Sequence, residues 1–443
     1  MKSKNIKTLI LILLLPFLLL SLKTILDLRK SASGVPANIT IHTQSLGTTI
    51  TGSLWKNISQ GGEEAKDMIA PVISPLKALD LQLIRIDHLF DYYQVDQGNG
   101  QYDFSRLDQA VNSILATGAK PMLSLSYTPD SKEPSDWNQW NRLVEATARH
   151  YSVEKNISGI YYEVWNEPDL FGGWHYGKSP SYLTLYKNTS LAVKKGAGNT
   201  VYKIGGPAIT AYYKNWITAL FKFTAANNLP LDFISWHKYS FNPDDYLRDF
   251  ENLNSILSNY PQYFNIERLI TEIGPNSEPD PAYDNSFSGI HLISLSTKLY
   301  GKIHRLFTFE AIDGPAPRSE KCTGWGILTH NGQIKPRYQA LQFLNQINGT
   351  QLAHEGDGTW VSSLSAKKGA IIQTLLVNYD PQNRHSETVP LTYTSLTPGN
   401  YILKTTPYLG KSTQKIITIT TSTHTENIYL APNTAYFLEL IPR

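Results

Sequence analysis

The sequence predicts an α/β protein built on a (β/α)8 TIM barrel, followed by a C-terminal antiparallel β-sandwich domain. Short apolar runs alternate eight times with longer amphipathic stretches up to about residue 347, and eight successive strand–helix units are typical of a closed parallel barrel. After about residue 346 the runs become short and β-rich. The chain has 443 residues, of which 41% are hydrophobic, so it is long enough to bury both cores.

The eight candidate barrel strands are short runs rich in apolar and β-branched residues. In chain order they are Thr49–Leu54, Leu83–Ile86, Pro121–Ser126, Ile160–Trp165, Tyr202–Gly205, Phe233–Trp236, Leu269–Thr271 and Leu306–Phe309. The stretches between them carry apolar residues at intervals of three and four positions, the spacing of a one-sided helix. The predicted helices are Leu107–Thr117, Trp137–Tyr151, Tyr182–Lys195, Trp216–Ala226, Tyr246–Leu257, Ser288–Tyr300 and Pro336–Ile347. We therefore expect the barrel over residues 44–347.

Five β-rich segments separated by turn-forming residues follow the barrel. They are Ala370–Asn378, Thr388–Thr394, Tyr401–Thr406, Lys415–Thr421 and Tyr436–Ile441. Short strands between such turns are typical of an antiparallel sandwich. We expect this domain over residues 348–443, and the strand-like residues 35–43 can contribute to it.

The first 33 residues have the composition of an export segment. Three lysines precede an uncharged apolar run from Thr8 to Leu22, which is the layout of a secretory signal. The run is short for a bilayer span of about 20 residues, so a cleaved signal peptide and an uncleaved membrane anchor both stay open. Either one predicts an extracellular or cell-surface protein that contacts the membrane through this segment alone.

The charge of the chain is concentrated in the same segment. The net charge is +3, and six basic residues face one acidic residue within the first 33 positions. The rest of the chain has 34 basic and 36 acidic residues, a net charge of −2, and contains no basic run. This distribution argues against a nucleic-acid partner. The single cysteine excludes an internal disulfide framework and a cysteine-rich zinc site.

Polar side chains gather where the predicted barrel strands end, which is where a barrel of this type places its active site. Strand four ends in YYEVWNEPD, which contains Asn166 and Glu167, and strand seven contains Glu272 in LITEIG. These strands lie nearly opposite each other in an eight-stranded barrel, so the two carboxyl groups can face each other across a sugar. Glycoside hydrolysis requires such a pair. One group protonates the leaving oxygen, and the other attacks the anomeric carbon or activates water.

Neighbouring strand ends supply side chains that suit these roles. Asn166 can hydrogen-bond a sugar 2-hydroxyl, a contact that strengthens in the transition state. His237 and Tyr239 on strand six can orient and tune Glu272. Arg85 on strand two can keep Glu272 ionised, because a nearby cation lowers the pKa of a carboxyl group; a structural ion pair is its alternative role.

Glu167 has to keep its proton near neutral pH, with help from apolar burial and from the charge of its partner. Asn166, Arg85, His237 and Tyr239 are also expected to bind the substrate. Four further residues are substrate-binding candidates, because a strand end or a flat aromatic face can place them against a sugar: Asp87, His88, Trp174 and Trp325. The alternative for the two tryptophans is a place in the core.

The run from strand two to the last barrel helix resembles glycoside hydrolase family 39, a family of retaining (β/α)8 glycosidases. The matching pieces cover about residues 80–345 and are YDFSRLDQAVNSILATGAKPMLSLSYTP, YYEVWNEPDL, KIGGPAIT, LPLDFISWHKYS, LITEIG and GWGILTHNGQIKPRYQAL. The resemblance implies that Glu167 is the acid/base, that Glu272 is the nucleophile, and that the reaction passes through a glycosyl-enzyme. It also implies a C-terminal β-sandwich.

The chain departs from the family at positions that shape the sugar subsite. Members usually carry a histidine two residues after the strand-two arginine, where this chain has Asp87, and His88 follows one place later. Phe307, Ala311 and Ser124 stand at or near the places of a tryptophan, an aspartate and a glutamate in the family. The family's substrate classes, β-xylosides and α-L-iduronides among others, therefore do not transfer directly.

These observations predict a retaining glycoside hydrolase that acts on an oligo- or polysaccharide, with a β-xylosidase-like activity as one option. A non-catalytic carbohydrate-binding barrel and a transglycosylase that uses the same carboxylates are the alternatives. In each case the partner is a carbohydrate. We expect no cofactor and no metal, because the sequence shows no cluster of His, Asp and Glu with the spacing of metal ligands. The sugar, exo or endo action and the oligomeric state stay open.

Overall fold

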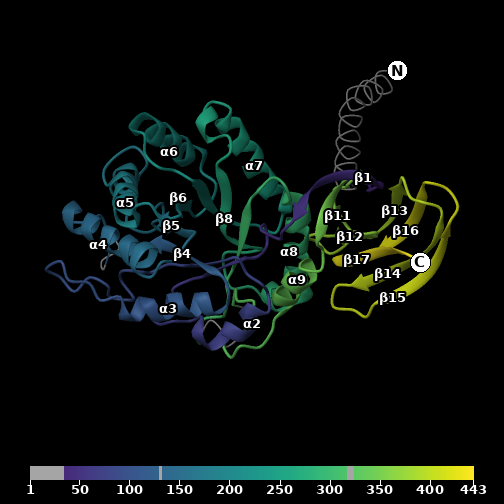
Figure 1. The fold of residues 1–443 in the computed structure, drawn as a ribbon, viewed down its shortest axis with the longest axis horizontal. Coiled ribbons are helices and arrows are strands. Elements are labelled where there is room, and N and C mark those ends of the chain that lie inside the picture. Colours follow the sequence, from purple (N-terminus) through teal and green to yellow (C-terminus); the bar gives the residue numbers. More distant parts are fainter. Residues whose placement is uncertain (1–33, 129–131, 317–323) are drawn as a thin grey trace, which may run out of the picture.

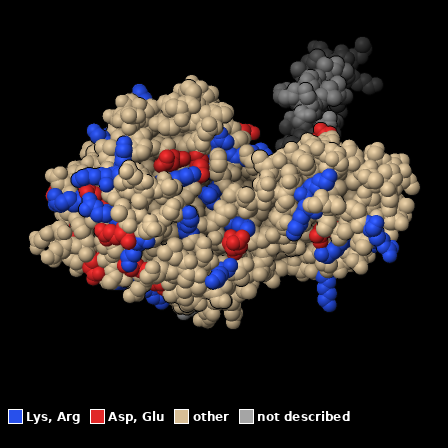
Figure 2. Space-filling model, viewed as in Figure 1, with Lys and Arg blue, Asp and Glu red and all other residues tan. Residues whose placement is uncertain are grey.

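The computed structural model describes residues 34–128, 132–316 and 324–443. Figure 1 shows a barrel lobe and, beside it, a sheet lobe in green and yellow. The predicted export segment, residues 1–33, lies outside the described residues. Among the helices that are described, none is long and apolar enough to cross a bilayer. On the face shown in Figure 2, acidic and basic side chains are intermingled.

Eight parallel strands close the barrel in chain order, which confirms the predicted fold. They are β2 (Asn57–Gln60), β3 (Leu83–Ile86), β4 (Lys120–Leu125), β5 (Ile160–Val164), β6 (Tyr202–Ile209), β7 (Phe233–Tyr239), β8 (Glu267–Gly274) and β9 (Arg305–Phe309). The surrounding helices are α2 (Ile73–Lys77), α3 (Ser105–Ala116), α4 (Trp137–Arg149), α5 (Tyr182–Ala197), α6 (Lys214–Asn227), α7 (Pro243–Leu257), α8 (Ser286–Leu299) and α9 (Pro336–Leu344).

The first barrel strand differs from the predicted one. We expected Thr49–Leu54, whereas the strand is β2, and the chain up to Ile50 belongs to the sheet lobe. The sequence of β2, NISQ, is polar and therefore does not read as a core strand, yet all four of its residues are buried. Their polar groups find partners inside the barrel: Ser59 Oγ donates to the carbonyl oxygen of Thr271 at 2.5 Å.

The sheet lobe is one hydrogen-bonded sheet of nine strands in the order β15-β14-β17-β12-β11-β10-β1-β13-β16. Its strands are β1 (Ile39–Ile50), β10 (Gly349–Glu355), β11 (Val361–Lys368), β12 (Ile371–Asn378), β13 (Glu387–Thr394), β14 (Gly399–Pro407), β15 (Thr413–Ile419), β16 (His424–Leu430) and β17 (Thr434–Pro442). All pairs are antiparallel except β1 with β13. Side chains from distant strands, such as Leu391 and Leu440, share one apolar core, which is the packing of a sandwich.

The sheet lobe packs against the barrel at α8 and α9 (Figure 1). Thr297 Oγ1 on α8 lies 2.6 Å from Ser362 Oγ on β11. The hydroxyl of Tyr408 donates to the carbonyl oxygen of Pro336, the first residue of α9, at 2.6 Å. These contacts lie on the outer side of the helix ring.

The barrel interior changes from apolar to polar toward the carboxyl ends of the strands. One interior layer consists of Leu83, Met122, Tyr161, Phe233, Leu269 and Phe307. On several of these strands the residue two positions further along is polar and fully buried; examples are Arg85, Ser124, Glu163 and Ser235. Because side chains alternate along a strand, this second layer lies directly above the apolar one. It forms a polar floor for the site.

Candidate active site

A cleft of about 860 Å³ opens above this floor. Its lining includes seven of the predicted site residues: Asp87, His88, Asn166, Glu167, Tyr239, Glu272 and Trp325. The strand-end rule therefore located the cleft from the sequence. Three other predicted residues, Arg85, His237 and Trp174, are buried outside this lining.

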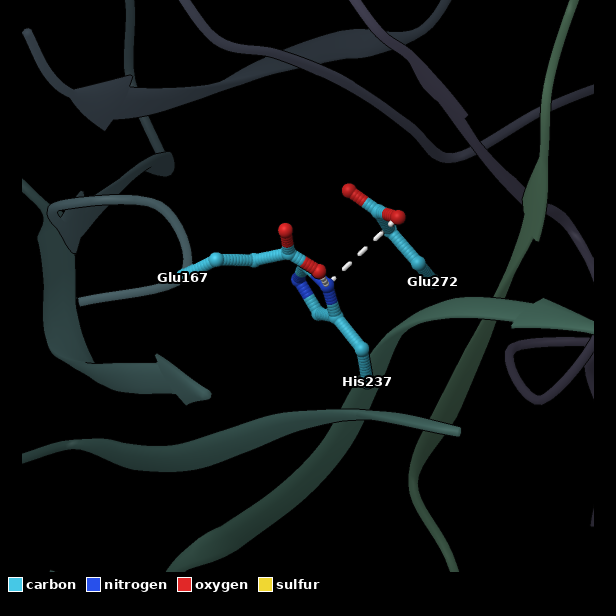
Figure 3. Close-up of side chains that lie close together, drawn as sticks. All are labelled: Glu167, His237 and Glu272. Atoms are coloured by element: carbon cyan, nitrogen blue, oxygen red, sulfur yellow. Dashed lines mark hydrogen bonds and ion pairs between the residues drawn. The ribbon is translucent and has the colours of Figure 1, made fainter. Parts of the chain in front are cut away.

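Glu167 and Glu272 point toward each other with His237 between them (Figure 3). His237 Nδ1 lies 2.9 Å from Glu167 Oε1 and 3.4 Å from Glu272 Oε2. One carboxylate oxygen of each glutamate lies within 4.8 Å of the other. A shift in the register between β7 and β8 pairs His237 with Glu272 rather than with Thr271. Such irregularities often re-aim side chains next to active sites.

The turn after β5 holds Glu167 in place. Glu167 and Trp165 both have a left-handed backbone, with φ of 47° and 70°, a conformation that is costly for residues other than glycine. The amide of Glu167 donates to the carbonyl oxygen of Ala208 at 2.9 Å. The amides of Leu170 and Phe171 donate back to the carbonyl oxygen of Glu167 at 2.9 and 2.7 Å. This closed turn explains how the strained conformation is maintained.

Arg85 connects three acceptors beneath the cleft. Its Nε donates to Glu163 Oε2 at 2.6 Å, its Nη1 to Glu272 Oε1 at 3.2 Å, and its Nη2 to Asn166 Oδ1 at 2.6 Å. Arg85 and His237 are fully buried and lie outside the lining of the cleft, so the structure gives no support to their predicted direct contact with substrate. They act on Asn166 and on the two facing glutamates. Glu163 was not among the predicted site residues.

Two tyrosine hydroxyls complete this network. Tyr239 donates to Glu272 Oε2 at 2.7 Å, as expected. Tyr127 accepts a hydrogen bond from Asn166 Nδ2 at 2.7 Å and lines the cleft. Tyr127 was missed, although it directly follows predicted strand Pro121–Ser126, so the strand-end rule was able to find it.

Burial raises the pKa of Glu272 to about 7, and the negative charge of Glu167 contributes to this rise. The positive charges of His237 and Arg85 and the hydroxyl of Tyr239 oppose it. Burial lowers the pKa of His237, but the two glutamates outweigh this effect and raise it overall. Burial therefore more than offsets the lowering of the Glu272 pKa that was expected of Arg85. Arg85, His237 and Tyr239 all converge on Glu272 and favour its ionised form.

Asp87 and His88 form one wall of the cleft. Burial raises the pKa of Asp87, and within the described structure its Oδ1 has no hydrogen-bond partner. His88 Nδ1 lies 2.7 Å from Asp91 Oδ2, and its ring stacks on Tyr92 with centroids 4.1 Å apart. A Cβ at Gly62 would come within 2.1 Å of the His88 ring, so glycine is required there. Both predicted residues remain candidates for sugar contacts.

The two candidate tryptophans have different surroundings. Trp325 lines the cleft beside Phe309, with ring centroids 5.9 Å apart. Trp174 is 2% exposed and packs against Trp165 and Trp137, at 5.4 and 6.5 Å between centroids. The structure therefore favours the alternative role of Trp174, a place in the core, because the chain after Glu167 folds this side chain inward.

Folding brings together a group of potential metal ligands that sequence spacing did not reveal. One ligand atom each from Glu167, His237 and Glu272 lies within 4.8 Å of the others. Arg85 already donates to Glu272, and its fixed positive charge opposes a second cation at the same carboxylate. The absence of a metal requirement remains a prediction.

Comparison with known proteins connects this site to a family. A β-xylosidase from Geobacillus stearothermophilus is 24% identical over 297 residues, 58% of each chain. Another from Caldicellulosiruptor saccharolyticus is 27% identical over 305 residues, 59% of this chain and 60% of that one. The chain thus matches about three fifths of the length of these relatives.

A solved structure shares the fold, and a family profile covers most of the chain. The monomeric β-xylosidase from Caulobacter crescentus CB15 superposes with a TM-score of 0.75 at 19% identity, covering 92% of this chain and 99% of that one. The profile of the glycosyl hydrolases family 39 matches residues 72–375. The chain therefore belongs to glycosyl hydrolase family 39.

Proposed function

We propose that this protein is a retaining glycoside hydrolase that cleaves O-glycosidic bonds by double displacement. The separation of the two glutamates carries the proposal, since an oxygen of Glu167 lies within 4.8 Å of an oxygen of Glu272. Retaining enzymes hold their two carboxyl groups about 5–5.5 Å apart, and inverting enzymes about 6.5–9.5 Å apart. The short separation favours direct attack by a carboxylate over attack by an intervening water.

In the first step, Glu272 attacks the anomeric carbon while Glu167 gives its proton to the departing glycosidic oxygen. In the second step, Glu167 takes a proton from water, the water oxygen bonds to the anomeric carbon, and Glu272 is released as a carboxylate. Asn166 is held by Arg85 and Tyr127 so that it can meet the sugar 2-hydroxyl. Tyr239 donates to Glu272 and stabilises the carboxylate before attack and after release.

The charge of the cleft favours a neutral glycone, the sugar on the Glu272 side of the bond. Six carboxyl groups line the cleft: Glu63, Asp87, Glu167, Asp169, Glu272 and Glu278. Lys238 and His88 are the basic residues in the described lining, and Lys238 pairs with Asp249 at 3.1 Å. A uronate would enter this negative field at a cost. A β-xyloside-like substrate agrees with this charge, and the two curated relatives are β-xylosidases.

Aryl glycosides test the proposal directly. The protein should release nitrophenol from a neutral β-glycoside such as the β-xyloside, and NMR should show that the first sugar product keeps the configuration of the substrate. The α-L-iduronide should react at least tenfold more slowly. A product of inverted configuration would refute double displacement. Sugar binding without release would favour the carbohydrate-binding alternative, and transfer to added sugars at the expense of hydrolysis would favour the transglycosylase.

The composition of residues 1–33 supports an extracellular or cell-surface location. Cell fractionation and N-terminal sequencing of the mature protein test this proposal. A mature chain that begins near residue 33 indicates a cleaved signal, whereas an intact N-terminus in the membrane fraction indicates an anchor. Full-length protein in the cytosol would contradict both.

A further inference from the structure

The loops on the Glu167 side of the cleft expose large apolar side chains. Leu170, Phe171 and Tyr213 are 61%, 43% and 42% exposed, and all three line the cleft. A concentration of exposed apolar side chains usually marks a binding surface. We infer that Phe171 and Tyr213 form a platform that stacks on the first sugar ring of an oligosaccharide leaving group. This inference rests on the proposed hydrolase function and adds a substrate class to it.

The position of Glu167 decides which part of the substrate meets the platform. The proton donor must reach the glycosidic oxygen, and the leaving group begins at that oxygen. Leu170 and Phe171 belong to the same turn as Glu167, since their amides donate to its carbonyl oxygen. Tyr213 follows β6, the strand next to β5. Both platform residues therefore border the leaving group.

The platform is held rigidly before any ligand binds. The carbonyl oxygen of Phe171 accepts a hydrogen bond from Trp165 Nε1 at 3.0 Å, and its ring meets the Tyr127 ring edge to face with centroids 5.8 Å apart. Preorganised groups lose little entropy when a ligand binds.

The loop that carries Tyr213 is fastened to the Glu167 turn. The amide and hydroxyl of Thr210 donate to Asp169 at 3.0 and 2.5 Å, and Thr210 Oγ1 lies 3.4 Å from the hydroxyl of Tyr213. Asp169 also lines the cleft. A pyranose presents an apolar face and a rim of hydroxyls. Flat aromatic rings beside a carboxylate match both parts of such a ring.

The binding surface continues beyond Tyr213. A second, shallow cavity of about 650 Å³, widely open to solvent, lies along the start of α6, and its lining includes Tyr212, Tyr213, Lys214 and Asn215. Because Tyr213 lines both cavities, a leaving group that stacks on the platform can extend into the second one. The geometry points to substrates with at least two sugars beyond the scissile bond.

Chain-length kinetics test the platform. The substrates are oligosaccharides of two to four units and a glycosyl fluoride. The non-reducing sugar of the oligosaccharides and the sugar of the fluoride are both the one that the aryl glycoside screen selects. Fluoride leaves without a sugar ring, so the ratio of kcat/KM for the trisaccharide to kcat/KM for the fluoride isolates leaving-group binding. This ratio should fall about tenfold, equivalent to about 1.4 kcal/mol, in Phe171→Ala and in Tyr213→Ala. It should be largely kept in Tyr213→Phe, which retains the ring.

Exposed aromatic residues away from the cleft provide matched controls. Phe264 and Tyr429 are 66% and 59% exposed, and Phe264→Ala and Tyr429→Ala should leave the ratio unchanged. In the wild type, kcat/KM should rise from the disaccharide to the trisaccharide. The platform is overturned if Phe171→Ala loses no more than Phe264→Ala. The extension into the second cavity is overturned if kcat/KM does not rise from the disaccharide to the trisaccharide. A wild-type protein that hydrolyses neither the fluoride nor any aryl glycoside would instead overturn the hydrolase function, and this inference with it.

Discussion

Replacing Tyr239 with phenylalanine should move the acidic limb of the activity profile toward higher pH. The Tyr239 hydroxyl donates to Glu272 Oε2 at 2.7 Å and is one of the groups that oppose the rise in the pKa of this buried carboxyl, which lies at about 7. The hydrogen bond favours the ionised form, so its loss raises the pKa further. The nucleophile is then ionised only at a higher pH.

The expected size follows from the strength of such a hydrogen bond. A hydrogen bond to a charged group contributes about 1.5–3 kcal/mol, and each 1.36 kcal/mol changes an ionisation equilibrium tenfold. Below neutral pH, kcat/KM of Tyr239→Phe should therefore fall about 10- to 100-fold. The loss should shrink as the pH rises past the shifted limb, where Glu272 is ionised in both proteins.

The assay is the pH dependence of kcat/KM on an activated aryl glycoside, which reports the ionisation of the free enzyme. Tyr162→Phe is a suitable control, because this buried hydroxyl lies 2.8 Å from Ser152 Oγ on the outer side of β5. If Tyr239→Phe lowers kcat/KM equally at every pH, or not at all, the assignment of the acidic limb to Glu272 is refuted.

Four other substitutions or treatments have defined outcomes. Glu272→Ala should abolish turnover, and near-normal rates would remove Glu272 as the nucleophile. Glu167→Ala should reduce kcat on substrates with poor leaving groups far more than on 2,4-dinitrophenyl glycosides, and equal losses would argue against an acid role. Trp174→Ala should destabilise the fold by about 3–5 kcal/mol in a urea titration, because Trp174 is 2% exposed; a stable variant with a raised KM would restore it as a substrate contact. Dialysis against EDTA should leave kcat unchanged, and activity that is lost and then restored by a divalent cation would show that Glu167, His237 and Glu272 bind a metal.

Local patterns in the sequence predict most of the barrel. Seven of the eight predicted barrel strands overlap observed ones, because apolar runs and helical spacing reflect burial of the same side chains. The exception is β2, in which three of the four buried residues are polar. Ser59 and Gln60 find partners at Thr271 on β8 and at Glu310, the residue after β9, more than 200 positions away. No local pattern contains those partners. The adjacent β1 pairs with β10 and β13 from the far end of the chain, so its membership of the sheet is equally nonlocal.

The sequence by itself determined which strand ends carry carboxyl groups, and so it pointed to Glu167 and Glu272 as a facing pair. Side chains alternate along β5, so the interior position of Tyr161 also implies an interior position for Glu163, two residues further on. Only the tertiary structure decided which of these groups touch. Closure of the barrel places Arg85 against Glu163, Glu272 and Asn166, and the register shift at β8 sets His237 beside Glu272. The physical reason is that periodicity records whether a side chain is buried, whereas its partners depend on how separate strands are brought together.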